Sequence, residues 1–154
     1  MRDIVNERVK YREGYRPFGG SVIAEAALAY FEMYAASPFM LEVCRVLPHR
    51  RSDLPAITHV DGTCRPHTVE RTVNPQYWAL LTEFAKLTGH PVVLNTSFNV
   101  AGEPIVCTPD DAVRCFCGSG LDTLVIGSYV VRKEQSRAFG GFVDTAAAVR
   151  SIIT

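Results

Sequence analysis

The stretch NPQYWALLTEFAKLTGHPVVLNTSFNVAGEP (74–104) contains the signals for a helix, a strand and a polar loop in succession. Asn74 before a proline is typical of a helix N-cap, apolar residues then recur at helical spacing, and a glycine ends the run, so we predict a helix over 75–88. The β-branched run 91–94 lies between turn-forming residues and predicts a buried strand. This strand leads into the polar loop 95–104, which places small hydroxyl and amide side chains at a strand end.

The residues after this stretch repeat the same kinds of signal. Thr108 is followed by a proline and two acidic residues, which predicts a helix start, and Gly118 and Gly120 predict its end. The apolar run 124–131 predicts a second buried strand. The tail 134–154 carries two adjacent glycines and a short Ala/Val/Ile stretch, from which we expect a linker and a weak terminal helix.

The residues before the stretch are less regular. Helix-forming residues over 24–36, closed by a Ser-Pro pair, predict a helix. The segments 40–47 and 55–60 have the composition of strands and are separated by a charged turn. Strands that alternate with helices indicate an α/β or α+β fold. We expect one domain over 1–132 and a separate tail over 133–154.

Length and composition limit the class of protein. The chain has 154 residues, and a domain typically has roughly 150. Lys plus Arg and Asp plus Glu both number 16, so the formal net charge is zero, and we do not expect a protein that coats nucleic acid. The apolar runs fall short of the ~20 residues that cross a bilayer, so we expect no membrane span. Five cysteines, without a secretory apolar region at the start, predict a reduced, cytoplasmic protein without disulfides.

Basic residues near the start are candidates for anion binding. Lys10 and Arg12 would project from the same face of an extended segment, whereas a helix would splay them, and Arg16 follows closely. Several cations on one face suit a phosphate-rich ligand. The alternative is a solvated basic edge whose charge is balanced by Glu7 and Glu13.

Two loops carry further candidate ligand-binding residues. The loop 59–65 follows the predicted strand 55–60 and contains an Asp-Gly turn, and Arg65 is the residue there that we most expect to contact a ligand. The small polar side chains of the loop 95–104, together with Gly102, suit a phosphate, a ribose or a base edge. The same residue types also form ordinary turns, so both interpretations stay open at each loop.

Known metal-binding and catalytic motifs do not stand out. The close pairs are Cys64 with His67 and Cys115 with Cys117, and neither has the spacing of a structural zinc site. We therefore expect no metal ligands. The sequence likewise lacks a Walker loop, a dinucleotide fingerprint and an evident Ser/His/Asp arrangement.

Several long strings, in register, resemble the C-terminal domain of the NodU/CmcH-type carbamoyltransferases, enzymes that O-carbamoylate antibiotics and nodulation factors. The strings are VKYREGYRPFGGSV (9–22), HVDGTCRPHTV (59–69), NPQYWALLTEFAKLTGHPVVLNTSFNVAGEPIV (74–106) and GLDTLVIGSYVV (120–131). They cover most of the chain in the family's order. The chain departs from the family's usual residues at Gly19-Gly20, Cys64 and His67.

The family's domain is similar to the YrdC-type threonylcarbamoyladenylate synthases, whose K-x-R and S-x-N elements resemble Lys10-Tyr11-Arg12 and Ser97-Phe98-Asn99. The resemblance implies a YrdC-like α+β domain, a twisted mixed sheet flanked by helices. It implies that this domain forms carbamoyladenylate from carbamoyl phosphate and ATP with Mg²⁺. It also implies a partner, an actin-like, iron-binding carbamoyltransferase domain that passes the carbamoyl group to the hydroxyl of a small molecule such as an antibiotic precursor.

The resemblance also implies roles for individual residues. By position in the family, Lys10, Arg16 and Arg65 are expected to be catalytic. The expected substrate-binding and nucleotide-binding residues are Arg12, Thr63, Asn95, Ser97 and Asn99. Fixed cations at such positions would stabilise the negative charge that builds up on phosphoryl oxygens and pyrophosphate in the transition state.

A second hypothesis describes a non-catalytic nucleotide-binding or regulatory subunit that needs a separate actin-like transferase domain. A third, a binder of double-stranded RNA, follows from analogy with the YrdC-type fold and is disfavoured by the zero net charge. Where a partner domain would pack, exposed apolar surface would also favour a homo-oligomer.

Overall fold

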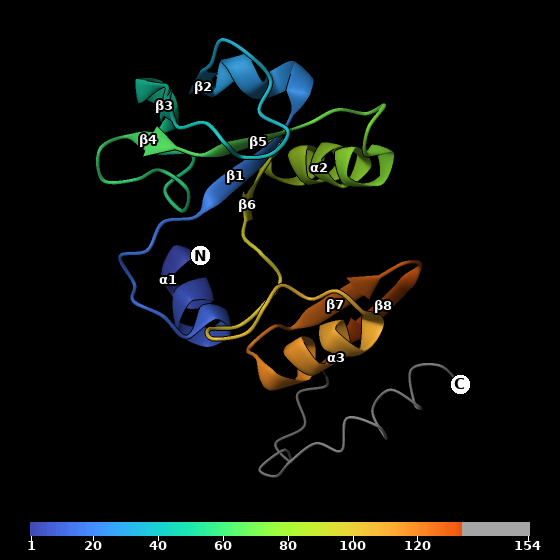
Figure 1. The fold of residues 1–154 in the computed structure, drawn as a ribbon. Coiled ribbons are helices and arrows are strands. Elements are labelled where there is room, and N and C mark those ends of the chain that lie inside the picture. The colour runs from blue at the N-terminus through green and yellow to red at the C-terminus, as the bar shows by residue number, and fades with distance from the viewer. Residues whose placement is uncertain (134–154) are drawn as a thin grey trace. The chain divides into compact units, whose positions relative to one another are not determined.

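The computed structural model describes residues 1–133, which form two compact units (Figure 1). The first unit contains Met1–Arg2 and Tyr15–Thr96, and the second contains Asp3–Gly14 and the residues from Ser97 onward. The segment around Lys10 therefore belongs to the same unit as the residues after Ser97. The sequence analysis treats residues 1–132 as one domain, and that domain boundary stays a prediction.

The first unit is built on a mixed three-stranded sheet. Its central strand β1 (Gly19–Ile23) runs parallel to β5 (Pro66–Val69) and antiparallel to β6 (Val92–Asn95). Helix α2 (Pro75–Thr88) packs against β1 and β6, as Figure 1 shows. The start of β1 lies beside the end of β6, where Gly19 pairs with Asn95. This pairing positions the second polar cluster described below.

A second, antiparallel sheet completes the first unit. It has the order β2 (Phe31–Glu32), β3 (Cys44–Val46) and β4 (Thr63–Cys64). One 3₁₀ helix, η2 (Ala24–Ala29), connects β1 to β2, and a second, η3 (Pro48–Arg50), lies between β3 and β4. The core that joins these elements is made of buried apolar side chains, among them Val22, Tyr30, Phe31, Val46, Leu54, Ile57 and Val92.

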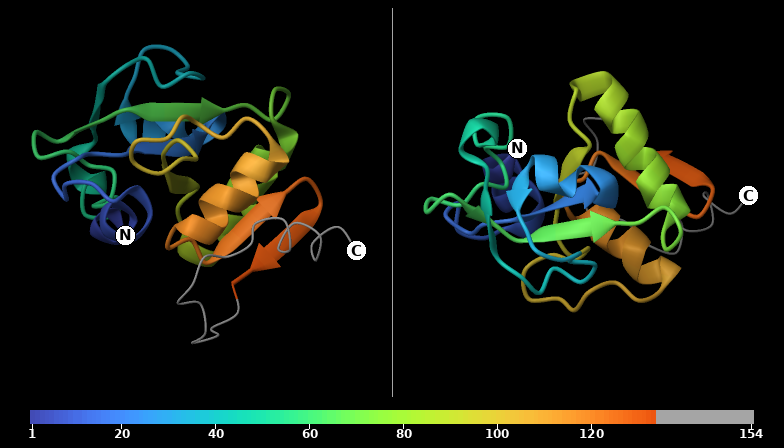
Figure 2. Two further views of the ribbon diagram at one scale, coloured as in Figure 1. Left: turned by 60° about the horizontal axis from the view of Figure 1, so that its bottom comes forward. Right: turned by 90° about the horizontal axis from the view of Figure 1, so that it is seen from above.

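The second unit combines the N-terminal helical segment with a helix and a hairpin. The segment consists of α1 (Arg2–Val5), which starts one residue before the unit, and a π-helical turn, η1 (Asn6–Lys10). Helix α3 (Pro109–Gly118) packs against the hairpin of β7 (Thr123–Ile126) and β8 (Tyr129–Arg132), as the left view of Figure 2 shows. The core of this unit contains Ala112, Val113, Phe116 and Leu124.

The two long helices begin as their sequences predict. The Asn74 side chain accepts a hydrogen bond from the amide of Tyr77, and Gly89 ends α2 in the left-handed conformation. At α3, Thr108 and Asp111 form a reciprocal capping box. A capping side chain satisfies amides that the first helical turn leaves without partners, and a glycine adopts a positive φ without a Cβ clash. These two predicted helices and the predicted strand at 91–94 are confirmed.

Three predictions from the first half are corrected. The predicted helix 24–36 is a short 3₁₀ helix that ends at Ala29, because Phe31 enters the core as part of a strand. The predicted strand 40–47 is confined to Cys44–Val46, and Met40 has a left-handed backbone with φ of 56°. The predicted strand 55–60 is wrong, since this segment folds into turns in which the amides of Ile57 and Thr58 donate to Leu54 O.

One prediction from the second half is corrected as well. The predicted single strand 124–131 is a hairpin, because Gly127 adopts a φ of 56° and reverses the chain between β7 and β8. The predicted tail helix lies outside the described residues. The α+β class with a mixed sheet is confirmed, and that sheet is one of three small sheets within residues 1–133. The likeness to YrdC-type domains stays a prediction. Among the same residues, the helices are too short or too polar to span a bilayer.

Candidate functional site

The ammonium group of Lys10 lies inside a cage of oxygen atoms in the second unit. Lys10 is only 4% exposed. Its Nζ lies 2.5 Å from Ser97 O and 3.2 Å from Ser97 Oγ, and it lies 3.0 Å from Asn99 O and 2.7 Å from Asn99 Oδ1. Lys10 of the K-x-R element therefore contacts both polar residues of the S-x-N element. We call Lys10, Ser97 and Asn99 the lysine cluster.

Local hydrogen bonds hold the loop that forms this cage. The Ser97 hydroxyl donates to Asn99 Oδ1 over 2.6 Å, and Asn99 Nδ2 donates to Glu103 O over 2.9 Å. Since the loop fixes its own acceptors, the oxygens that face Lys10 do not depend on a bound ligand for their positions. Preorganised dipoles of this kind bind a cation without further reorganisation.

Lys10 and Arg12 do not project from one face of an extended segment, which corrects that prediction. Lys10 ends the π-helical turn and Tyr11 has a left-handed backbone with φ of 48°, so the chain changes direction between the two cations. Arg12 Nε donates to Asn6 Oδ1 over 2.8 Å. Asn6 is 1% exposed, and its Nδ2 donates to Gly14 O. The buried Asn6 therefore orients Arg12.

Burial determines the electrostatics of the lysine cluster. Desolvation lowers the pKa of Lys10 below its ordinary value, and the nearby charge of Arg12 lowers this pKa further. The oxygen cage opposes both effects because hydrogen bonds to an ammonium favour its charged form. A lysine with a lowered pKa and fixed acceptors is a typical feature of functional sites.

A second polar cluster lies on the mixed sheet of the first unit and contains Asn95. Asn95 Nδ2 donates to Ser21 Oγ over 2.8 Å, and Ser21 Oγ lies 3.0 Å from His67 Nδ1. The rings of His67 and Tyr77 lie 6.0 Å apart between centroids. We call Asn95, Ser21, His67 and Tyr77 the asparagine cluster. Its four side chains come from β6, β1, β5 and α2.

The loop before β4 holds Thr63 by a turn of its own. Asp61 Oδ1 accepts hydrogen bonds from the amide and the hydroxyl of Thr63, over 2.9 and 2.7 Å, and His59 Nδ1 lies 3.1 Å from the same hydroxyl. These hydrogen bonds from Thr63 lower the pKa of Asp61. The geometry matches the plain Asp-Gly turn with a satisfied histidine that is one of the two interpretations of this loop.

Arg16 and Arg65 lie in the first unit, on its surface. Both are exposed. Arg65 O accepts a hydrogen bond from the Gly20 amide, so the backbone of Arg65 is tied to β1 while its side chain extends outward. Of the eight predicted site residues, the structure brings Lys10, Ser97 and Asn99 together, and it places Asn95 in a different cluster.

Sequence reasoning did not include Ser21 or Asn6 among the site candidates. It noted His67 as half of a cysteine–histidine pair and as a departure from the family's usual residue. The sheet register explains why Ser21 matters, since it stands opposite His67 across the parallel pair β1–β5. A serine within an otherwise small and apolar strand is the available signal, because a buried hydroxyl needs a partner.

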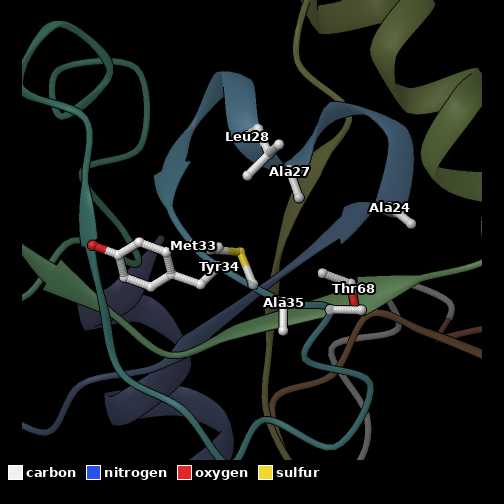
Figure 3. A pocket seen from close by; sticks show the side chains of 8 residues that line it. Ala24, Ala27, Leu28, Met33, Tyr34, Ala35 and Thr68 are labelled. Carbon is white, nitrogen blue, oxygen red and sulfur yellow. The ribbon is translucent and has the colours of Figure 1, made fainter.

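The cavity in Figure 3 has a different chemistry from the two polar clusters. It has a volume of about 270 Å³ and lies in the first unit. Its lining consists of apolar side chains, Tyr34 and Thr68, without a charged residue. A cavity of this composition does not suit a phosphate group, which requires cations or several donors.

Burial favours the thiol form of three of the cysteines. Burial raises the pKa of Cys44 to about 11 and that of Cys64 to about 12. Burial also raises the pKa of Cys115. Among residues 1–133, no three His, Cys, Asp or Glu side chains gather as metal ligands would.

The chain was compared with known proteins. A family model described as carbamoyltransferase C-terminus matches residues 1–133. The chain is 48% identical over 138 residues to nodulation protein NolNO of Sinorhizobium fredii and covers 20% of it. It is 39% identical over 126 residues to the 3'-hydroxymethylcephem-O-carbamoyltransferase of Amycolatopsis lactamdurans and covers 24% of it. These alignments include 88% and 82% of this chain, which thus spans about a quarter or less of the length of such relatives.

Proposed function

The chain belongs to the carbamoyltransferase C-terminus family, and from that premise we propose that it is the carbamoyladenylate-forming module of an O-carbamoyltransferase. In the proposed reaction, carbamoyl phosphate loses phosphate to water, and an oxygen of the resulting carbamate attacks the α-phosphorus of Mg²⁺-bound ATP. A P–O bond forms as the bond to pyrophosphate breaks. The product, carbamoyladenylate, would then supply the carbamoyl group for a small-molecule hydroxyl.

The observation that carries this proposal is the lysine cluster. A buried ammonium is costly unless it is fully bonded, and here it is held by oxygens from Ser97 and Asn99. When a phosphate oxygen approaches, it can replace one of these acceptors and gain a charged partner. Because charge builds up on phosphoryl oxygens during the displacement, a fixed cation stabilises the transition state more than the ground state.

The remaining site residues are proposed from their positions in the family. Arg16 and Arg65 would supply further positive charge, and both are exposed in the first unit and thus accessible to a ligand. Arg12, Thr63 and Asn95 would contact substrate or nucleotide. Mg²⁺ usually reaches such sites bound to substrate phosphates and keeps several waters, so we propose that it enters with ATP and needs no cage of side chains in this chain.

The transfer step is proposed to take place outside this chain. The relatives are four to five times as long as the part that matches, and one of them is by name a carbamoyltransferase acting on a cephem hydroxymethyl group. We propose that an actin-like, iron-binding domain or subunit receives carbamoyladenylate. The acceptor would be a natural-product hydroxyl, and the reaction would be cytoplasmic.

The saturation of Lys10 favours one alternative. Four oxygens lie within hydrogen-bond distance of Nζ, whereas an ammonium has only three protons to donate. A lysine that is already satisfied can be structural, and the chain would then be a nucleotide-binding or regulatory subunit without catalytic activity of its own, dependent on a separate actin-like transferase domain.

Pyrophosphate release separates these two functions. The full chain is incubated with ATP and Mg²⁺, with and without carbamoyl phosphate, and we expect release only when carbamoyl phosphate is present. Lys10→Ala and Arg65→Ala should each abolish it. The matched controls are Lys86→Ala and Arg132→Ala, which remove exposed cations elsewhere and should leave the rate unchanged.

The contrary outcomes are distinct. ATP binding in calorimetry without pyrophosphate release would support the regulatory alternative. Release that is unaffected by both Lys10→Ala and Arg65→Ala, with circular dichroism spectra like the wild type, would show that the site is assigned to the wrong residues.

A further inference from the structure

The asparagine cluster forms a neutral hydrogen-bonded chain across three strands. Ser21 on the central strand β1 is fully buried. His67 stands opposite it on β5, and Asn95 stands diagonally from it on β6, two residues from the direct partner Val93. Side chains two residues apart along a strand share a face, so the register places all three side chains on one side of the sheet.

The contacts within the asparagine cluster assign a donor and an acceptor to each hydrogen bond. Asn95 Nδ2 can only donate, so Ser21 Oγ accepts at 2.8 Å. The Ser21 hydroxyl then donates its own proton to His67 Nδ1 at 3.0 Å. Asn95 Nδ2 is also 3.3 Å from His67 Nδ1. The Asn95 Nδ2 contact requires an unprotonated Nδ1, because an amide nitrogen only donates, and the neutral imidazole then carries its proton on Nε2.

We propose that His67 is a positioning residue that acts through Ser21 to fix the Asn95 carboxamide, with Nδ2 turned inward and Oδ1 presented as an acceptor for the amino group of the carbamoyl substrate. This inference rests on the proposed function and deepens it. A carbamoyl group differs from an acetyl group by an NH₂ in place of a methyl. An acceptor opposite this NH₂ selects the carbamoyl group, because the methyl of an acetyl group would leave Asn95 Oδ1 without a hydrogen-bond donor.

Protonation of His67 reverses the direction of the hydrogen bonds in the asparagine cluster. Nδ1–H then donates to Ser21 Oγ, and the Ser21 hydroxyl is released to donate toward Asn95 Oδ1. The carboxamide turns over and directs NH₂ at the NH₂ of the substrate, where two donors oppose each other. The surroundings favour the neutral form, because burial lowers the pKa of His67.

The groups around His67 do not compete for its proton at neutral pH. Tyr77 on α2 is the titratable group that faces its ring, and burial raises the pKa of this phenol. Ser21 on β1 and Asn95 on β6 are uncharged. Burial lowers the His67 pKa, and among the described residues no charged neighbour adds to this shift.

The kinetic test compares the full-length wild type with His67→Gln and His67→Phe between about pH 5.5 and 8. Glutamine keeps an acceptor and does not titrate, whereas phenylalanine removes the acceptor. On acidification, KM for carbamoyl phosphate should rise roughly tenfold more in the wild type than in His67→Gln, at nearly constant kcat. Protonation of the substrate phosphate affects both proteins equally and cancels in this comparison.

His67→Phe should have a KM raised roughly tenfold at every pH, which is the loss expected for one hydrogen bond. Acetyl phosphate should also inhibit His67→Phe more strongly than it inhibits the wild type, when inhibition is expressed relative to each protein's affinity for carbamoyl phosphate. Identical pH profiles for the wild type and His67→Gln, or unchanged selectivity against acetyl phosphate in His67→Phe, would overturn the proposal. Urea unfolding of each variant shows whether it is folded under the assay conditions.

A measurement without turnover tests the chain of hydrogen bonds itself. In ¹⁵N NMR spectra at neutral pH, His67 should show the Nε2–H tautomer, and the side-chain amide of Asn95 should shift with the same midpoint as His67 titrates. An Nδ1–H tautomer, or an Asn95 amide signal that does not change as His67 titrates, would refute the proposed hydrogen-bonded chain. If the wild type releases no pyrophosphate, the proposed function fails and with it the role in selectivity, and the NMR titration then decides the hydrogen-bonded chain alone.

Discussion

The lysine cluster and the asparagine cluster bury polar groups in opposite ways. Around Lys10, a full positive charge is withdrawn from water and held by backbone and side-chain oxygens. Around Asn95, a hydroxyl links an amide to an imidazole that burial keeps neutral. Burying a charge costs far more than burying a neutral group. In the proposed function, the first cluster would stabilise charge and the second would orient the substrate.

Substitutions in the two clusters should therefore change different kinetic constants, and this is the largest effect that we expect. Lys10→Met keeps the apolar stem and removes the charge, so kcat for pyrophosphate release should fall at least roughly 100-fold. Asn95→Ala removes an orienting group, so KM for carbamoyl phosphate should rise about tenfold with a smaller change in kcat. Steady-state assays at neutral pH measure both. If both variants lose kcat equally, the distinction between the clusters is wrong.

The lysine cluster also depends on a close backbone approach, which gives the next largest effect. The Gly120 amide donates to Arg8 O over 2.7 Å, and a Cβ on Gly120 would lie 2.4 Å from that oxygen. Gly120→Ala must therefore displace the segment that carries Lys10. We expect a loss of about 1–3 kcal/mol in the free energy of unfolding, measured with urea, together with slower pyrophosphate release.

Gly118→Ala is the matched control for that substitution. A Cβ there meets no atom within 4 Å, and the residue is the last of α3. Since alanine is the better helix former, we expect no loss of stability. Equal losses in Gly118→Ala and Gly120→Ala would mean that contact with Arg8 is not the cause.

The two clusters also differ in how far the sequence could predict them. Helices α2 and α3 were predictable because each begins with a capping residue and a proline, signals that act within a few residues. The lysine cluster joins residues 87 and 89 positions apart, and only the family resemblance placed them together. Spacing alone instead predicted an extended Lys10 and Arg12, which is wrong.

The asparagine cluster shows what neither approach could supply. Ser21 is 74 positions from Asn95 and 46 from His67, and their meeting depends on the register of three strands. Register is set by tertiary packing, which a local pattern does not contain. For the same reason the segment 55–60 was predicted as a strand, although Leu54 and Ile57 enter the core from turns.

The capped helices provide a smaller and strictly local comparison of the two units. Thr108→Ala removes one half of the capping box of α3, and Asn74→Ala removes the cap of α2. Each should destabilise its helix by about 1 kcal/mol. In hydrogen exchange followed by mass spectrometry, Thr108→Ala should speed exchange in α3 and not in α2, and Asn74→Ala should do the reverse. Faster exchange in both helices of either variant would show that the two units unfold together.

The smallest effect that we expect is the fall in the free energy of unfolding at acid pH. It is small because His67 is partly exposed. Burial lowers its pKa in the folded protein below the ordinary value of 6.5. Between these two pKa values the unfolded chain binds more protons, so the free energy of unfolding falls as pH falls below 6.5 and levels off below the folded pKa. Urea midpoints should show this decline in the wild type and a weaker one in His67→Gln.

The lysine cluster should produce the corresponding change at the alkaline end. Desolvation lowers the pKa of Lys10 from its ordinary value of 10.5, so between the folded and unfolded pKa values the unfolded chain again binds more protons. The free energy of unfolding of the wild type should therefore rise with pH across this interval relative to that of Lys10→Met. If the difference between the two proteins has the opposite slope, the oxygen cage outweighs desolvation, and Lys10 is held as a stable cation over the whole pH range in which phosphate chemistry would use it.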